Sequence, residues 1–517
     1  MREAGTDPMA LSVTAREHAA YDEAVTRMRA LIGRTHQLYL DGADREATRV
    51  RPKHSPTDRG LVLGNFPAAI EHEVAMAIEA AHRAFGAWAS ATPSDRRGVV
   101  RRLGEAIESR ASDFAAVLSM EVGKNRREAL REVYGTTELL VSYCDEWASH
   151  GFAPDPERPH TRARGHHEEV GPHGVWAVFA PFHHPLAMAA APCAAALLAG
   201  NSVVLKAPEE APWTARLLAD AFHAAGAPAG TFNLLMGSPE DMGDAMFHDA
   251  RIAGATYTGS SGPAERLAAS LRARSGTVRH PCILEVTTKA ARVVTAQADL
   301  DLAASSIARA AFGMTGLRAS APSHCFVHDE VADAFLERLV AHTERLRVGD
   351  PTRPDTDVGP VVSSHDYLEY RAAAHLLRDL GGRVHAGGRV LDEHGLGAGN
   401  FVAPTVAEVP VDHPCWSQEM MQPILFVRRY HNPELAAATI AKLGRPRMLR
   451  VHGTAREERW FHRTVEARRG QATTSIASSW PTLFPFMRAD DTIAATVQSL
   501  HDYLAQYLAV RLVPDAH

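Results

Sequence analysis

Short apolar segments alternate with helical segments from residue 174 to residue 286, and this alternation restricts the possible folds most. Segments 174–181, 201–206, 231–237, 251–260 and 282–286 have the composition of buried strands, and the stretches between them have helical character. Strands that follow one another through helices form right-handed β-α-β crossovers and therefore a mainly parallel sheet. The sequence predicts an α/β fold of the doubly wound, nucleotide-binding type, although no GxGxxG motif follows any strand.

A second alternating block, from residue 290 to about 476, predicts another α/β unit. Helices are expected earlier in the chain, over residues 19–32 and over 71–88, where apolar residues recur every three or four positions. Residues 151–173 are rich in proline, histidine and charge, which is typical of a projecting hairpin or linker. The expected organisation is an N-terminal tail and helix (1–34), a nucleotide-binding domain (35–150 and 174–283), a second α/β domain (284–477) and two peripheral elements (151–173 and 495–517).

The composition is that of a soluble globular protein, with 517 residues, 45% apolar content and a net charge of −6. Charges are spread without long runs of one sign, so neither nucleic acid nor a membrane surface is an expected partner. Five scattered cysteines without CxxC spacing indicate no disulfide framework and no metal site. The first residues lack a signal-peptide pattern and no apolar run approaches the roughly 20 residues of a membrane span. We expect a cytoplasmic protein whose partners are small molecules and copies of itself.

The stretch from residue 284 to residue 320 begins with LEVTTK and ends with AFGMTGLRAS. It resembles the centre of the aldehyde dehydrogenase superfamily, where the glutamate of LELGGK is a base and the cysteine of FxxxGQxC is the nucleophile. Glu285 stands at the glutamate position and Ala319 at the cysteine position, with the spacing that the family uses. A thiolate is needed to add to the aldehyde carbonyl, and a methyl group cannot do so. The resemblance therefore implies that the spacing of the two catalytic positions is kept but that the nucleophile is absent.

Two motifs resemble the family's cofactor contacts. VVLKAPE at 203–209 is similar to VVLKPSE, so Lys206 and Glu209 would contact the adenine ribose. A carboxylate there repels a 2′-phosphate, which favours NAD over NADP. YTGSSGPA at 257–264 is similar to FTGSxxxG, which would place Gly259 and Ser260 at a helix N-terminus suited to a pyrophosphate.

The nicotinamide end of the cofactor site looks altered. QEMMQPI at 418–424 is similar to EEIFGPV, so Glu419 would hold the nicotinamide ribose, but Met421 and Gln422 replace the phenylalanine and the glycine. Phe182 stands where the family has a tryptophan beside the pyrophosphate. The resemblance therefore implies that adenosine capture is better preserved than nicotinamide binding.

PFHHP at 181–185 is similar to PWNFP, whose asparagine amide donates to the oxyanion, and His183 takes its place. An imidazole N–H can also donate, although the loss of one such donor typically costs about 10² to 10³ in rate. The alternative is a loop histidine without a catalytic role. Thr287 and Thr288 replace the glycine pair of LELGGK, and no GGxxxSG stretch is found near the C-terminus, so the substrate pocket is expected to differ from the family's.

Three functions remain open. EVGK at 121–124 and AFG at 311–313 are similar to the 1-pyrroline-5-carboxylate (glutamate semialdehyde) dehydrogenases. The favoured interpretation is a repurposed enzyme that acts non-covalently on an aldehyde- or imine-derived small molecule, with Glu285 as acid or base. A non-catalytic NAD-binding or assembly protein is the second, and an NAD-dependent semialdehyde dehydrogenase is the third. A single introduced Cys-to-Ala change would leave LELGGK and PWNFP untouched, so natural divergence explains the motifs better.

The family resemblance also implies a homodimer or a larger homo-oligomer. In the family, a C-terminal strand joins the sheet of a neighbouring subunit with the help of a hairpin. Residues 495–517 and 151–173 correspond to these two elements.

Overall fold

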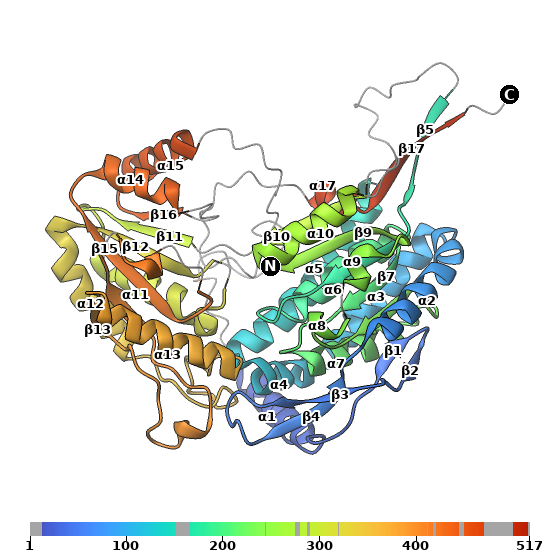
Figure 1. Ribbon diagram of the computed structural model, residues 1–517, viewed down its shortest axis with the longest axis horizontal. Coiled ribbons are helices and arrows are strands. Elements are labelled where there is room, and N and C mark those ends of the chain that lie inside the picture. The colour runs from blue at the N-terminus through green and yellow to red at the C-terminus, as the bar shows by residue number, and fades with distance from the viewer. Residues whose placement is uncertain are drawn as a thin grey trace.

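The computed structural model describes residues 13–150, 166–242, 244–273, 280–286, 290–318, 320–410, 412–416, 420–443, 449–469 and 500–514. Figure 1 shows two lobes and a two-stranded arm that projects from the lobe on the right. The lobe on the right holds α1 to α10 around a seven-stranded sheet, and the lobe on the left holds α11 to α15 around a six-stranded sheet.

The seven-stranded sheet has the order β10-β9-β6-β7-β8-β1-β2. Its strands are β1 (Leu38–Leu40), β2 (Ala43–Arg45), β6 (Val175–Phe179), β7 (Ser202–Lys206), β8 (Phe232–Leu235), β9 (Ile252–Gly259) and β10 (Cys282–Val286). Strands β6 to β10 are parallel, as their alternation with helices predicts, whereas β1 and β2 add an antiparallel edge. The order reverses between β6 and β9, and in such sheets the ligand binds at the carboxyl ends of the strands beside this reversal.

Helices cover both faces of this sheet. They are α1 (Ala15–Arg29), α2 (Glu71–Ala89), α3 (Pro93–Ser109), α4 (Ala111–Val122), α5 (Arg126–His150), α6 (Ala187–Leu198), α7 (Pro212–Ala224), α8 (Pro239–Met242), α9 (Ala245–His248) and α10 (Ser261–Ala273). The apolar stripe predicted for 71–88 is the buried face of α2, with Val74, Ile78 and Trp88 in the core. The first helix, expected from about residue 19 to residue 32, instead spans Ala15–Arg29, because Thr14 and Glu17 form a capping box that begins it four residues earlier.

The six-stranded sheet has the order β13-β14-β15-β12-β11-β16 and is parallel except for β13. Its strands are β11 (Ala290–Val294), β12 (Pro322–His328), β13 (Arg383–Ala386), β14 (Thr405–Glu408), β15 (Ile424–Tyr430) and β16 (Leu449–His452). The helices are α11 (Leu300–Phe312), α12 (Ala332–Glu344), α13 (Ser364–Asp379), α14 (Pro433–Lys442) and α15 (Ala455–Arg469). Apolar cores lie on both faces, so this sheet is also covered on two sides.

The projecting arm consists of β5 (His166–Pro172) and β17 (Leu508–Pro514), which pair antiparallel over their full lengths. The short helix α17 (Leu500–Ala505) precedes β17, and the remaining parts of the two predicted peripheral elements lie outside the described residues. Tyr507 anchors the base of the arm: its hydroxyl lies 3.0 Å from Oγ1 of Thr256, and its carbonyl accepts from the Asn201 amide at 2.8 Å. A separate hairpin, β3 (Val50–His54) and β4 (Val62–Pro67), flanks the first sheet. In the described part of the chain, no helix combines the length and the apolar character that a membrane crossing requires.

Candidate functional site

A cavity of about 690 Å³ lies at the carboxyl ends of the central strands of the first sheet. Phe179 ends β6, Lys206 ends β7 and Gly259 ends β9, and all three residues line the cavity. This is the position beside the reversal of strand order where doubly wound sheets bind ligands. Because the sequence motifs predict a dinucleotide at this place, we call it the dinucleotide cavity.

Most of the site residues suggested by the sequence meet in the dinucleotide cavity. Its lining includes Phe182, His183, Lys206, Glu209, Gly259 and Ser260. Glu285 is not among the lining residues. Ala319 and Glu419 lie outside the described residues.

Charged side chains at one end of the dinucleotide cavity are mainly acidic. Burial lowers the pKa of Lys206, and the carboxylates of Glu210 and Glu209 partly oppose this effect. Burial and the charge of Glu210 raise the pKa of Glu209, and Lys206 opposes them. Glu240 also lines the cavity. A ligand that brings hydroxyl groups to this end is therefore favoured over one that brings additional negative charge.

The backbone at the end of β9 allows a ligand to approach closely. A Cβ atom on Gly259 would lie 2.6 Å from the hydroxyl of Tyr257, so no other residue fits there without displacement. The thirteen-residue helix α10 begins at Ser261, directly after Gly259 and Ser260. The N-terminus of a helix offers unpaired amides and a positive dipole end, which suit a phosphate group.

His183 lines the dinucleotide cavity from the loop between β6 and α6. Its side chain is buried, and burial lowers its pKa well below the usual value, with further lowering by His184 and the Lys124 cation. The ring is therefore neutral at pH 7 and carries one N–H donor and one acceptor nitrogen. Such a ring can donate one hydrogen bond to a carbonyl oxygen.

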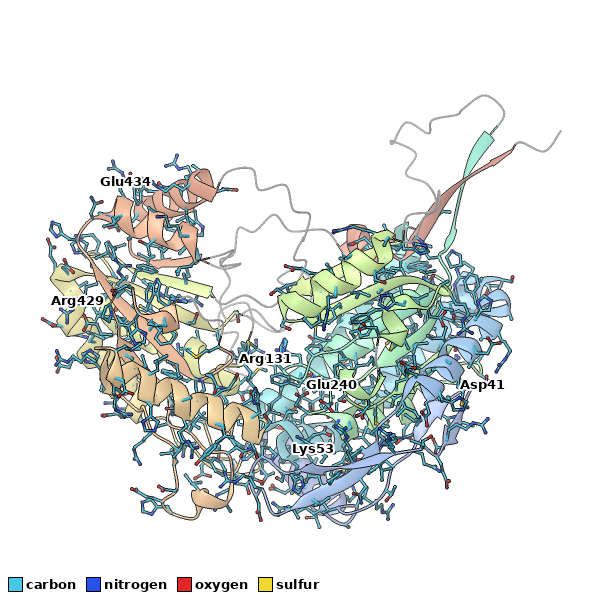
Figure 2. All side chains as sticks on the ribbon, viewed as in Figure 1. Asp41, Lys53, Arg131, Glu240, Arg429 and Glu434 are labelled. Atoms are coloured by element: carbon cyan, nitrogen blue, oxygen red, sulfur yellow. The ribbon has the colours of Figure 1, made fainter. Side chains whose placement is uncertain are left out.

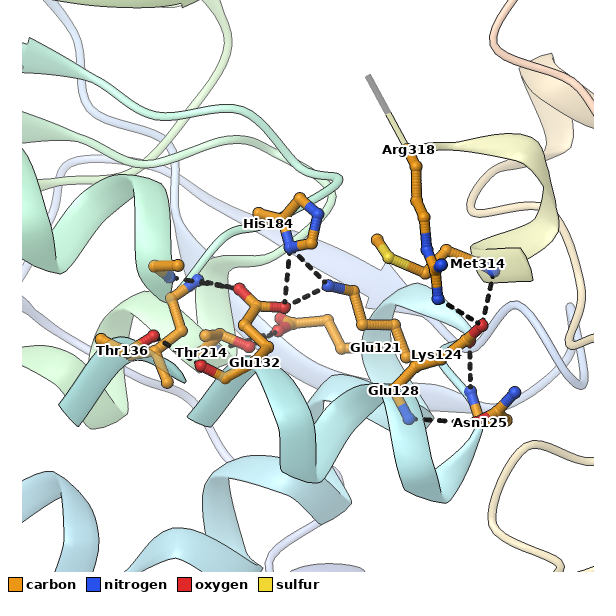
Figure 3. Close-up of polar contacts among 12 residues, drawn as sticks. Glu121, Lys124, Asn125, Glu128, Glu132, Thr136, His184, Thr214, Met314 and Arg318 are labelled. Atoms are coloured by element: carbon orange, nitrogen blue, oxygen red, sulfur yellow. Dashed lines mark hydrogen bonds and ion pairs between the residues drawn. The ribbon is translucent and has the colours of Figure 1, made fainter. Parts of the chain in front are cut away.

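Lys124, Glu132 and His184 form a buried polar group, which we call the lysine–glutamate network (Figure 3). It adjoins His183, whose ring centroid lies 5.6 Å from that of His184. Lys124 Nζ forms an ion pair with Oε2 of Glu132, and Nδ1 of His184 lies 3.4 Å from the same nitrogen. Oε1 of Glu132 accepts hydrogen bonds from the backbone amides of Leu186 and Ala187, at 3.0 and 3.2 Å. The network thus fixes the start of α6 and the loop that carries His183.

The carboxylate of Glu132 is held in its charged form. Burial would raise its pKa, but the Lys124 cation and the hydrogen bond with His184 outweigh this effect and lower the pKa to about 2. Burial lowers the pKa of Lys124, and Glu132 opposes that shift. A buried charged pair of this kind is stable because each ion has a partner within hydrogen-bonding distance.

A second carboxylate, Glu128, connects α5 to the second lobe. Its Oε1 accepts from the backbone amide of Met314 at 2.6 Å and lies 3.5 Å from Nη2 of Arg318 (Figure 3). Met314 and Thr315 have φ values of 51° and 54°, a left-handed conformation that is unfavourable for residues with a Cβ atom. The contacts of Glu128 stabilise this segment, which leads into position 319.

Glu285 is on β10, where it pairs with Thr258 of β9, and its side chain is 3% exposed. Thr258 lines the dinucleotide cavity, so Glu285 lies one strand away from it. Burial raises the pKa of Tyr143, Tyr503 and Tyr507, and the charge of Glu285 adds to the effect on each. The carboxylate is therefore within electrostatic range of this tyrosine group.

The four cysteines whose side chains are described are thiols at neutral pH. Burial raises the pKa of Cys144 to about 11 and that of Cys282 and Cys325 to about 12, and it raises the pKa of Cys193 well above its usual value. A thiolate is the reactive form of cysteine, so these residues are protected from nucleophilic chemistry.

Glu128, Glu132 and Arg318 were not among the residues predicted from the sequence. One signal was present for Glu132: it lies on the same helical face as Ala129, Val133 and Leu140, which are all buried. A carboxylate within an apolar helical stripe indicates a buried partner, because an unpaired buried charge is very costly.

Comparisons with known proteins agree with this geometry. Residues 43–441 match the family described as "Aldehyde dehydrogenase family". The chain is 28% identical over 426 residues to a 1-pyrroline-5-carboxylate dehydrogenase of Bacillus subtilis (strain 168), covering 81% of each protein. It is 31% identical over 376 residues to a 2,5-dioxopentanoate dehydrogenase of Saccharolobus solfataricus, covering 72% of this chain and 76% of that protein. Its fold is similar to a crystal structure of 1-pyrroline-5-carboxylate dehydrogenase from Thermus with bound NAD, with a TM-score of 0.83, 24% identity and 99% of both chains covered.

Proposed function

Because the chain belongs to the aldehyde dehydrogenase family, we propose that it binds NAD and acts on a small aldehyde- or imine-derived molecule without a covalent thiohemiacetal intermediate. The observation that carries the proposal is the alanine at position 319, in a chain whose dinucleotide-binding residues line one cavity. The raised pKa values of the four described thiols support it, since none of them is poised to replace the missing nucleophile.

The dinucleotide cavity has the features that NAD requires. Lys206 and Glu209 would hold the adenine ribose, and Gly259, Ser260 and the N-terminus of α10 would hold the pyrophosphate. Phe182 would lie beside them, and Glu419 would hold the nicotinamide ribose. Bound NAD supplies a hydride acceptor. The carboxylates of Glu209, Glu210 and Glu240 support NAD over NADP, because a 2′-phosphate would meet like charges.

His183 and Glu285 carry the remaining chemistry in this proposal. The neutral imidazole of His183 would donate a hydrogen bond to the substrate oxygen, in the place of the family's asparagine amide. Glu285 would accept or return a proton, which requires its side chain to turn toward the cavity from β10. The buried position of Glu285 next to a cavity-lining strand supports this role.

The test is the substitution Glu285→Gln, with Glu138→Gln as a control on an exposed carboxylate of α5. Turnover is followed with a panel of aldehydes, aldehyde hydrates and cyclic imines in the presence of NAD, and dinucleotide binding is measured by calorimetry. We expect Glu285→Gln to lower turnover by at least about 10²-fold with unchanged NAD affinity, since loss of a positioned acid or base costs 10²–10⁴-fold. Unchanged turnover would reject the role of Glu285.

A non-catalytic NAD-binding or assembly protein is the second candidate, and it is favoured by the absence of Glu285 from the residues that line the dinucleotide cavity. Tight NAD binding without turnover of any member of the panel would support it. Robust NADH production from glutamate semialdehyde would instead support an NAD-dependent semialdehyde dehydrogenase and overturn the proposal of non-covalent chemistry.

We further propose that the protein is a homodimer or a larger homo-oligomer. The support is the β5–β17 arm, which projects beyond the first lobe with two strand edges (Figure 1). Exposed edges of this kind can add to the sheet of another chain.

A further inference from the structure

A second cavity, of about 430 Å³, shares no lining residue with the dinucleotide cavity. It is formed by the N-terminal turn of α5, the C-terminal halves of α11 and α12, and the segments around residues 318 and 357. Both lobes therefore contribute to it. Arg131, one of its lining residues, lies at the junction of the two lobes in Figure 2. We call it the arginine cavity.

The lining of the arginine cavity is strongly cationic. It contains the side chains of Arg127, Arg131, Arg309, Arg318 and Arg345, together with His342. Among the described residues of the lining, two carry carboxylates, Glu128 and Asp357. Five guanidinium groups thus face two acidic groups.

Both carboxylates are already engaged. Glu128 accepts from the Met314 amide and pairs with Arg318, and Asp357 forms ion pairs with Arg127 and Arg347 at 3.1 Å each. Their negative charge is therefore not available to the other arginines of the lining.

Arg309 and Arg345 have no ion-pair or hydrogen-bond partner for their side chains among the described residues. Arg309 lies in the last turn of α11, and Arg345 is the C-cap residue of α12. The negative end of each helix dipole favours a cation there, which explains why the fold accepts them without a carboxylate. Their guanidinium groups remain available to a ligand.

Some residues that line the arginine cavity are also close in sequence to position 319, where the family has its nucleophile. Arg318, 11% exposed, is the residue before Ala319 in the sequence, and Gly313 at the start of the same segment is another lining residue. Glu128 links the cavity to the segment that leads into position 319. A ligand bound in the cavity would therefore lie beside that segment.

We propose that the arginine cavity binds a small polyanion, either a phosphate ester or a polycarboxylate, and so selects doubly charged aldehyde-derived substrates. The selection of substrates rests on the proposed function, whereas the existence of the anion site does not. Guanidinium groups present paired donors that match phosphate and carboxylate oxygens, and several of them around one cavity favour a ligand with more than one negative charge. A zwitterionic amino acid would leave its ammonium group without a free carboxylate in this lining.

The experiment measures the binding of inorganic phosphate, citrate and acetate to the full-length protein by calorimetry at low salt. The test variant is Arg309→Gln/Arg345→Gln. Both arginine side chains are exposed in the native protein, so their replacement should not disturb the core. Arg371→Gln, on the exposed face of α13, is the matched control, and Arg266→Gln reports on binding in the dinucleotide cavity. Unfolding midpoints verify that all variants are folded.

We expect phosphate or citrate to bind at least about tenfold more tightly than acetate, and the double variant to lose at least about tenfold in affinity, as removal of charged hydrogen bonds predicts. Tighter binding of phosphate identifies a phosphate ester, and tighter binding of citrate identifies a polycarboxylate. The proposal would be overturned if acetate bound as tightly as the polyanions, or if neither polyanion bound. It would also be overturned if Arg266→Gln lowered the polyanion affinity and the double variant did not. If phosphate or citrate binds as expected while Glu285→Gln leaves turnover unchanged, only the proposed function fails.

Discussion

Nδ1 of His184 lies 3.6 Å from Oε2 of Glu132, inside a buried group that also contains Lys124. Burial and the Lys124 cation lower the pKa of His184 to about 4, against the opposing charge of Glu132. The ring is therefore neutral at pH 7, and the network holds one cation and one anion. This balance lets the protein keep two ions in its interior directly behind the loop that carries His183.

Substitution of Glu132 should destabilise the protein strongly. Glu132→Gln would leave Lys124 buried without its counter-ion, which costs on the order of 3–5 kcal/mol in comparable buried pairs. The measurement is the free energy of unfolding in urea at pH 7. Glu138→Gln, an exposed carboxylate on the same helix, is the control and should change stability by less than about 0.5 kcal/mol. A variant as stable as the native protein would show that the ion pair does not contribute.

The Lys124–Glu132 ion pair predicts that the stability of the protein depends on pH. The pKa of Glu132 is lowered to about 2 in the folded protein from an ordinary value of 4.5. Its stabilising contribution is complete above pH 4.5 and is lost as the pH falls toward 2. The difference in unfolding free energy between the native protein and Glu132→Gln should therefore narrow over that interval. A difference that stays constant between pH 5 and pH 2 would contradict the charge assignment.

Cofactor preference should follow the acidic end of the dinucleotide cavity. The protein is expected to bind NAD at least about tenfold more tightly than NADP, because a 2′-phosphate would approach the like charges of Glu209 and Glu210. The double substitution Glu209→Gln/Glu210→Gln should reduce this ratio toward one. Calorimetric titration with each dinucleotide measures it, and Glu138→Gln should leave the ratio unchanged. A higher NADP affinity in the native protein would be incompatible with this prediction.

The four described thiols should react slowly. Cys144, Cys193, Cys282 and Cys325 have raised pKa values, so at pH 7.5 the thiolate fraction of each is very small. Treatment of the native protein with iodoacetamide, followed by peptide mass mapping, should show labelling of these four only after denaturation. Intact-mass measurement after incubation with an aldehyde and NAD should likewise show no acyl adduct. Rapid labelling of any of the four would identify a candidate nucleophile and reopen the covalent route.

Removal of the projecting strand should change assembly without unfolding the subunit. Truncation after Tyr507 deletes β17 but keeps the contacts of Tyr507 with Thr256 and Asn201. Light scattering at micromolar concentration should show a smaller assembly, and the unfolding midpoint of the remaining structure should stay within a few degrees. Truncation after Pro514 keeps β17 and serves as the control. An unchanged assembly after removal of β17 would place the subunit contacts elsewhere.

Local patterns and the motif resemblance predicted a large part of this structure. The alternation of strands and helices predicted the parallel strands β6 to β10, and the motifs around Lys206 and Gly259 predicted residues that meet in one cavity. These features depend on short stretches of sequence whose spacing repeats from one unit to the next.

Contacts between distant segments could not be predicted in this way. The arginine cavity combines side chains from α5, α11, α12 and the segment near residue 357, which no local periodicity connects. His184 is 60 residues from Lys124 in the sequence, and their proximity depends on how α6 packs against α5. The start of α1 at Ala15 depends on the capping box between Thr14 and Glu17, which apolar periodicity does not record.

The attachment of Tyr507 to Thr256 has a consequence for regulation. Thr256 belongs to β9, the strand that ends at Gly259 in the wall of the dinucleotide cavity. One strand therefore connects the base of the C-terminal arm to the place where a pyrophosphate would lie. If the arm mediates the proposed self-association, a ligand that prefers one arrangement of this strand would also shift the association equilibrium, and the affinity for the dinucleotide would then depend on the protein concentration.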